Sequence, residues 1–199
     1  MRVAVCASGG GSNLGALLRA LDRSVEAQVV LVLSNKATAG ALERGRAAGV
    51  AVEVLSDFRD PAEWLRRMAA YQVDLIVLAG YLKMVPPQVI AAYAGRIINI
   101  HPALLPDFGG AGMYGHHVHA AVLASGATRS GATVHLVDEV YDRGEILAQA
   151  IVPVLPDDTA ETLAARVLGA EHQLLPMVVL SAARAGRPVP LPAPLKFPA

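Results

Sequence analysis

The sequence predicts an α/β domain with a doubly wound, mainly parallel sheet, helices on both faces and a mixed edge formed by the late strands. Short β-rich apolar runs alternate with alanine- and leucine-rich helical patterns over the first hundred residues. A glycine-rich turn joins the first strand to the first helix, and two late strands lie close enough in sequence to pair. With 199 residues, 54% of them hydrophobic, the chain can build one substantial core.

The first half of the chain supplies the parallel strands and the helices that connect them. Strands are expected at residues 2–7, 27–33, 52–55, 74–79 and 97–100, and helices at 13–21, 39–48, 61–71 and 87–93. Helices of this length between successive strands imply right-handed crossovers and parallel pairing. The predicted architecture is therefore Rossmann-like.

The alternation of strands and helices ends after Pro106. A glycine-rich segment at 109–115 is expected to be a mobile substrate loop, and a helix is expected at 117–124. Strands at 132–137 and 146–154 are expected to form a hairpin, and a helix at 159–174 follows a predicted N-cap at Asp158. Five prolines predict an extended tail. We therefore expect a domain at 1–186 and a proline-rich tail at 187–199.

Charge and cysteine content narrow the classes of partner. Seventeen basic residues balance seventeen acidic ones, so we expect no nucleic-acid or membrane partner and favour a small-molecule substrate. The single cysteine, Cys6, lies in an apolar run, where we expect a buried thiol in a reducing cytoplasm. The apolar run after Arg2 is too short for a signal peptide or a membrane span. A cytoplasmic monomer or homodimer is expected.

A glycine-rich loop, Gly9-Gly10-Gly11-Ser12-Asn13-Leu14, follows the first strand and opens the first helix. Unpaired N–H groups and the positive end of the helix dipole suit a phosphate, which we expect at Gly10, Gly11, Ser12 and Asn13. Leu14 replaces the third glycine of the dinucleotide motif and the P-loop lysine is missing, which disfavours nicotinamide and nucleoside triphosphate ligands. The alternative is a plain tight turn in which Ser12 or Asn13 only caps the helix.

Asn99 and His101 end the fifth predicted strand and, two residues apart, point to the same side. A neutral donor beside a group that titrates near pH 7 can polarise a carbonyl and move a proton. Ligands bind beyond the carboxyl ends of strands in such sheets, so this pair and the glycine loop should border one cleft. A protonated imidazole needs a nearby carboxylate, for which Asp142, Asp138 and Glu139 compete.

Three histidines, His116, His117 and His119, raise the question of a metal site. Neighbouring His116 and His117 diverge on a helix, and no carboxylate or cysteine stands beside them at ligand spacing. We therefore expect no bound metal.

Several ordered motifs together are more specific than any one of them. They are Cys6-Ala7-Ser8-Gly9, Gly11-Ser12-Asn13-Leu14, Ser34-Asn35-Lys36-Ala37, Leu78-Ala79-Gly80-Tyr81, Asn99-Ile100-His101-Pro102 with Leu104-Leu105-Pro106, Thr133-Val134-His135 and Glu171-His172. Over nearly its whole length the chain resembles the phosphoribosylglycinamide formyltransferases, the folate-dependent enzymes of purine synthesis.

The resemblance implies roles for particular residues. Asn99, His101 and Asp142 match the catalytic trio, and Gly11, Ser12 and Asn13 match the phosphate site. The segment implied to hold the ribose or glycinamide portion is Leu168, Gly169, Ala170 and Glu171. The residues implied to bind folate are Arg59, Leu82, Lys83, Met84, Val85, Asp138, Glu139, Val140 and Tyr141. Lys83 stands where the family commonly has arginine, which keeps the charge but loses the planar fork.

The implied reaction moves a formyl group from the co-substrate 10-formyltetrahydrofolate to the amine of glycinamide ribonucleotide. Asn99 and protonated His101 are expected to stabilise a tetrahedral oxyanion, with Asp142 raising the pKa of His101. A methionyl-tRNA formyltransferase is disfavoured by chain length and neutral charge. A formylfolate hydrolase would need water in place of the amine, and a non-catalytic nucleotide- or folate-binding module would not need the three side chains together.

Overall fold

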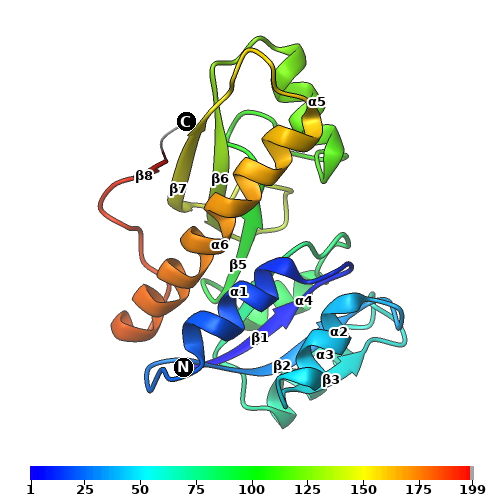
Figure 1. Cartoon of the computed structure of the whole chain (residues 1–199). Helices are drawn as coiled ribbons and strands as arrows, with labels where there is room; N and C mark the ends of the chain where they lie inside the picture. Colours follow the sequence, from blue (N-terminus) through cyan, green and yellow to red (C-terminus); the bar gives the residue numbers. More distant parts are fainter. Residues whose placement is uncertain (198–199) are drawn as a thin grey trace.

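A computed structural model describes residues 1–197 and contains an eight-stranded sheet with strand order β3-β2-β1-β4-β5-β6-β7-β8 (Figure 1). The strands are β1 (Arg2–Cys6), β2 (Gln28–Ser34), β3 (Ala51–Val54), β4 (Leu75–Leu78), β5 (Ile97–His101), β6 (Arg129–Leu136), β7 (Ile146–Pro153) and β8 (Leu195–Lys196). The helices are α1 (Ser12–Leu21), α2 (Gly40–Ala47), α3 (Pro61–Ala70), α4 (Pro87–Ala92), α5 (His116–Ala124) and α6 (Ala160–Ala185).

The strand pairing confirms the predicted doubly wound, mainly parallel sheet. Strands β1 to β5 pair in parallel, and the strand order changes direction between β1 and β4. Strand β6 is antiparallel to both β5 and β7, so the late strands make the sheet mixed, as expected. The loops after β1, β4 and β5 therefore leave the same edge of the sheet, where ligands bind in such folds.

Alternating side chains along each strand build a core on each face of the sheet. Val3 and Val5 of β1 pack with α1, α2, α5 and α6, whereas Ala4 and Cys6 pack with α3 and α4. The thiol of Cys6 is fully buried, and burial raises its pKa, so the thiolate is disfavoured as predicted for a core cysteine. Figure 1 shows α1 and α6 side by side on one face of the sheet.

Helix α6 is longer than the pattern predicted, because it continues through Pro176 to Ala185. Its apolar stripe goes on beyond the proline and is buried against the sheet, and this packing outweighs the local cost of proline. The helix ends where Gly186 adopts φ 74°. By length and composition alone α6 could cross a membrane, and half of its most apolar window is buried inside the protein.

The N-cap of α6 is Thr159, which forms a capping box with Thr162. The expectation that Asp158 is the N-cap of this helix is wrong. The Asp158 carboxylate instead accepts hydrogen bonds from Arg166 at 2.6 and 2.8 Å and from the backbone N–H of Leu155 at 2.8 Å.

The proline-rich segment runs along the edge of the sheet and pairs with β7. The backbone N–H of Leu191 donates to Leu147 at 2.7 Å, and that of Phe197 donates to Ile151 at 2.9 Å. Leu195 and Lys196 form β8 in parallel with β7. The residues between the prolines keep their N–H groups, so they supply ladder donors that the proline count did not predict.

Candidate functional site

The glycine loop is shaped by its contact with the start of α2. Gly11 adopts φ 73°, and a Cβ there would lie 2.8 Å from the Cα of Ala41. No side chain caps α1, so the alternative in which Ser12 or Asn13 only caps the helix is wrong. Asn13 instead donates from Nδ2 to Oε2 of Glu171 at 2.5 Å. The N–H groups of the first helical turn therefore remain available to an anion.

Glu171 closes the far side of the hollow that begins at the glycine loop. Burial raises the pKa of its carboxyl to about 7, although the hydrogen bond from Asn13 acts in the opposite direction. Leu168 and Glu171 line this hollow, which measures about 1230 Å³ with its open mouth, whereas Gly169 and Ala170 do not line it. The carboxyl of Glu171 can therefore accept hydrogen bonds from hydroxyl groups or from an ammonium group.

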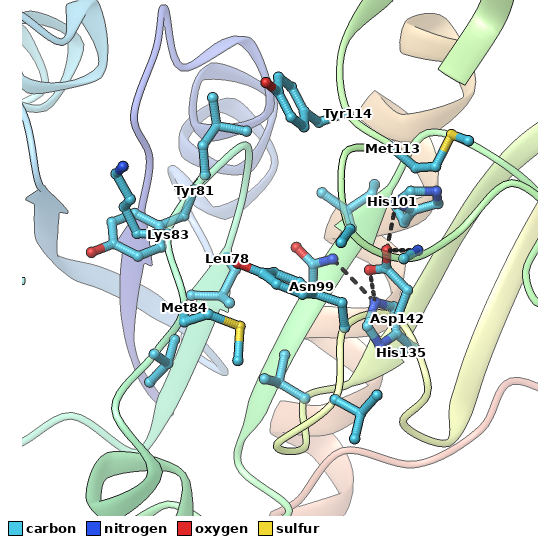
Figure 2. A pocket seen from close by; sticks show the side chains of 18 of the residues that line it. Leu78, Tyr81, Lys83, Met84, Asn99, His101, Met113, Tyr114, His135 and Asp142 are labelled. Atoms are coloured by element: carbon cyan, nitrogen blue, oxygen red, sulfur yellow. Dashed lines mark hydrogen bonds and ion pairs between the residues drawn. The ribbon is translucent and has the colours of Figure 1, made fainter. Parts of the chain in front are cut away.

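The predicted trio comes together at the ends of β5 and the loop after β6 (Figure 2). His101 Nδ1 lies 3.6 Å from Oδ2 of Asp142. His135 Nε2 lies 3.5 Å from the other carboxylate oxygen and 3.1 Å from Nδ2 of Asn99. Asn99, His101, His135 and Asp142 thus form one connected polar cluster.

The structure selects Asp142 among the three competing carboxylates. Asp138 accepts the backbone N–H of Val140 at 2.8 Å within its own turn. Asp142 also accepts the N–H of Gly110 at 2.8 Å from the glycine-rich loop. Burial opposes its ionisation, but the hydrogen bonds from His135 and Gly110 and the nearby imidazoles outweigh burial and lower its pKa. Asp142 is therefore a carboxylate at neutral pH.

His101 departs from the expected protonation state. The side chain is 4% exposed, and its burial lowers the pKa below the ordinary 6.5 more than Asp142 and the carbonyl of Phe108 raise it. Asp142 thus raises the pKa of His101 as predicted, but burial outweighs this effect and does not favour the protonated imidazole that was expected. Because Nε2 lies 2.9 Å from the carbonyl oxygen of Phe108, this nitrogen carries the hydrogen. In the neutral ring Nδ1 is then bare and faces Asp142.

His135 also belongs to the site, although the sequence pattern did not predict a role for it. In the antiparallel pairing of β5 with β6, His135 stands directly opposite Asn99. Its Nδ1 lies 2.7 Å from the carbonyl oxygen of Leu136 and donates to it, and its Nε2 faces both Nδ2 of Asn99 at 3.1 Å and Oδ1 of Asp142 at 3.5 Å. The available signal was the motif Thr133-Val134-His135, but the sequence did not show that β5 pairs with β6.

A second hollow of about 820 Å³, its mouth included, opens above this cluster, a size typical of small-molecule sites. Figure 2 shows His101, His135 and Asp142 on one side and Tyr81, Lys83 and Met84 on the other. The predicted folate residues that line it are Leu82, Lys83, Met84, Val85, Asp138, Val140 and Tyr141. Gly80 and Ile100 line both hollows, so a ligand in each would meet beside the cluster.

The family model described as Formyl transferase matches residues 1–179. The chain belongs to the formyl transferase family. The resemblance drawn from the motifs and the Rossmann-like fold are both confirmed.

This formyl transferase is 46% identical over 185 residues to the chloroplastic phosphoribosylglycinamide formyltransferase of Vigna unguiculata, covering 89% of the chain and 59% of that protein. It is 38% identical over 186 residues to phosphoribosylglycinamide formyltransferase of Escherichia coli (strain K12), covering 90% and 85%. The crystal structure of phosphoribosylglycinamide formyltransferase from Anaplasma phagocytophilum superposes with a TM-score of 0.90 at 33% identity, covering 100% and 98%. The chain thus spans about three fifths of the plant relative and most of the bacterial ones.

Two predicted folate residues of this formyl transferase lie outside the second hollow. Glu139 and Arg59 are not among the residues that line it. The guanidinium of Arg59 stacks on Phe58 at 5.0 Å, and the ammonium of Lys83 lies 5.1 Å from the same ring. Arg59 and Lys83 therefore place two cations around one ring, with Lys83 at the wall of the hollow.

The histidines of α5 separate into different environments. His116 Nε2 lies 2.8 Å from Oε1 of Glu161, and His117 stacks edge-to-face on Tyr114 at 5.7 Å. His119 is buried at the wall of the first hollow, and burial lowers its pKa. Within residues 1–197, no three side chains of metal-ligating type stand close enough together to hold an ion.

Proposed function

We propose that this formyl transferase moves the formyl group of 10-formyltetrahydrofolate to the amine of glycinamide ribonucleotide in de novo purine synthesis. The observation that supports it is the meeting of Asn99, His101 and Asp142 beside the junction of two hollows, one of which ends at an anion-binding helix N-terminus. Relatives named phosphoribosylglycinamide formyltransferase support the choice of substrates. The proposal requires no metal and places a monomer or homodimer in the cytosol.

The proposed binding mode assigns one substrate to each hollow. The phosphate of the ribonucleotide binds the N–H groups of the loop from Gly10 to Asn13, at the positive end of α1. Glu171 accepts hydrogen bonds from the ribose or from the glycinamide portion. The folate lies in the largely apolar hollow between Met84 and Tyr141. Its formyl group then reaches the polar cluster.

In the proposed mechanism the amine nitrogen attacks the formyl carbon, and a new carbon–nitrogen bond forms while the carbonyl oxygen becomes an oxyanion. The amide of Asn99 donates to this oxyanion, and the positive charge that His101 gains on taking a proton stabilises it electrostatically. The proton of the amine passes to Nδ1 of neutral His101, where the Asp142 carboxylate stabilises the imidazolium. The same proton goes to the folate nitrogen as its bond to the formyl carbon breaks, so no covalent enzyme intermediate forms.

Loss of 10-formyltetrahydrofolate, followed by absorbance with and without glycinamide ribonucleotide, tests the proposal. Strict dependence on the ribonucleotide is expected. Equal loss without the ribonucleotide would identify a hydrolase that uses water. Binding of both ligands without turnover would identify a non-catalytic module, and either result would refute the transferase.

Replacement of Asn99 by alanine tests the oxyanion donor. We expect Asn99→Ala to lower kcat roughly a hundredfold, because one such donor contributes on the order of ~3 kcal/mol to the transition state. The KM values should change far less. Circular dichroism and Tm establish that the variant is folded, and a folded variant with near-normal kcat would remove Asn99 from the mechanism.

A further inference from the structure

The side chain of Ser8 joins three loops at the ligand-binding edge of the sheet. Ser8 lies between β1 and the glycine loop and is 5% exposed. Its hydroxyl donates to Oδ1 of Asn35 at 2.6 Å and accepts the backbone N–H of Leu82 at 2.9 Å. Its own backbone N–H donates to the carbonyl of Gly80 at 2.9 Å. One residue thus contacts the segments that follow β1, β2 and β4.

Two of these segments line different hollows. The glycine loop begins at Gly9, directly after Ser8, and lines the hollow proposed for the ribonucleotide. Leu82 begins the segment that lines the hollow proposed for folate. Gly80, which accepts from Ser8, adopts φ 73° and lines both hollows. Ser8 therefore ties a segment that lines one hollow to a segment that lines the other.

A hydroxyl has one hydrogen, and the Ser8 hydroxyl donates it to Oδ1 of Asn35. A lone pair of the same oxygen holds the N–H of Leu82. Without the hydroxyl both partners lose a part-buried hydrogen bond, and the 82–85 segment loses a polar contact with the start of the glycine loop. Ser130 offers a contrast, because its buried hydroxyl has no hydrogen-bond partner in the described structure.

We propose that Ser8 is a positioning residue that couples the two substrate sites, by holding the 82–85 segment in register with the phosphate-binding loop. The inference rests on the proposed function and extends it to the affinity of each substrate in the presence of the other. A ribonucleotide that fixes the glycine loop also fixes the segment that receives folate. Binding of either ligand therefore strengthens binding of the other, because such coupling is reciprocal.

Calorimetric titration of tetrahydrofolate, with and without saturating glycinamide ribonucleotide, measures this coupling. In the wild-type protein we expect the ribonucleotide to lower the Kd of tetrahydrofolate about fivefold or more. In Ser8→Ala this ratio should fall to about one, while the Kd of the ribonucleotide alone stays within about twofold. The KM for 10-formyltetrahydrofolate should rise about three- to tenfold with kcat and its pH profile retained.

Ser130→Ala is the matched control, because it removes a buried serine hydroxyl that makes no hydrogen bond, and its coupling ratio should equal that of the wild type. Ser8→Cys keeps the size of the side chain but replaces the hydroxyl by a weak donor and acceptor, so its coupling ratio should also fall, and it decides the question if Ser8→Ala does not fold. A wild-type coupling ratio in Ser8→Ala, or equal weakening of both ligands together with a lower Tm, would overturn the inference. A wild-type protein that binds both ligands without coupling also overturns it, whereas one that binds neither ligand overturns the proposed function instead.

Discussion

Asp142 combines a charge that the mechanism needs with a backbone conformation that few residues adopt. Its φ is 57°, a left-handed value that aspartate and asparagine tolerate better than other side chains with a Cβ. Asparagine therefore keeps the turn while removing the negative charge that faces His101 and His135. This makes Asp142→Asn a substitution that separates electrostatics from folding.

We expect Asp142→Asn to lower kcat at least about a hundredfold, because the imidazolium of His101 loses its anionic partner, with little change in Tm. Steady-state kinetics and thermal unfolding provide both measurements. Asp157→Asn is the control, since that residue is exposed and lines neither hollow, and its kcat should stay within a few-fold of the wild type. Retention of normal kcat in folded Asp142→Asn would exclude the proposed proton carrier.

Glu171 makes stability depend on pH in a definite direction. The carboxyl has a pKa of about 7 when folded, against an ordinary 4.5. Between these values the native state keeps a proton that the unfolded chain has lost, so the free energy of unfolding falls as pH rises through this window, by about 3 kcal/mol from this group. Urea unfolding at pH 5 and pH 8 should show a smaller pH-dependent loss in Glu171→Gln than in the wild type. Parallel pH dependence in both proteins would contradict the burial of an ionisable Glu171.

At the residue scale the sequence predicted which side chains gather but not their protonation. Alternation along a strand was enough to place Asn99 and His101 on one side. It could not show that His101 is only 4% exposed, and the balance between burial and the Asp142 charge depends on that exposure. The role of His135 was not predicted for a related reason. Its place opposite Asn99 depends on the register between β5 and β6, which are far apart in the sequence.

Among the elements, the start of α1 depends most on a single residue. Gly11 needs φ 73° and a close approach to Ala41, so a side chain at this position meets both strain and a steric clash. We expect Gly11→Ala to lower the free energy of unfolding by about 1–3 kcal/mol. It should also weaken the binding of the ribonucleotide more than the binding of folate. Chemical unfolding and calorimetry measure the two effects.

Gly169→Ala is the stability control, because nothing lies within 4 Å of a Cβ at that position inside α6. It should raise stability by up to about 1 kcal/mol through helix propensity. A Gly11→Ala protein as stable as the wild type, with unchanged affinity for the ribonucleotide, would contradict the described loop.

Element types were predicted well from periodicity, and element ends less well. The five parallel strands follow from their apolar runs. The end of α6 was missed because Pro176 is a local helix breaker, whereas the buried stripe that continues past it is a tertiary effect. Strand β8 was missed because backbone pairing with β7 depends on where the tail lies, which no local pattern contains.

For the whole molecule, the C-terminal segment covers an edge of the sheet. The hydrogen bonds of Leu191 and Phe197 occupy groups of β7 that would otherwise be exposed. We expect a chain shortened after Arg187 to have a Tm lower by a few degrees and a greater tendency to associate, with kcat retained. Thermal unfolding, light scattering and the absorbance assay measure these three properties. An unchanged Tm and a monodisperse truncated protein would show that the segment contributes nothing to the sheet.

Because β6 pairs with β5, the site is sensitive to insertions and deletions within β6. The composition of the strand does not reveal this. A deletion of one residue within β6 would still leave an apolar strand able to pair with β5. The alternation would be inverted, however, so that an apolar neighbour, Val134 or Leu136, would take the place of His135 opposite Asn99. Changes in length can therefore accumulate in the connection from 102 to 128, while within β6 they would leave a folded protein with its histidine turned toward the wrong face.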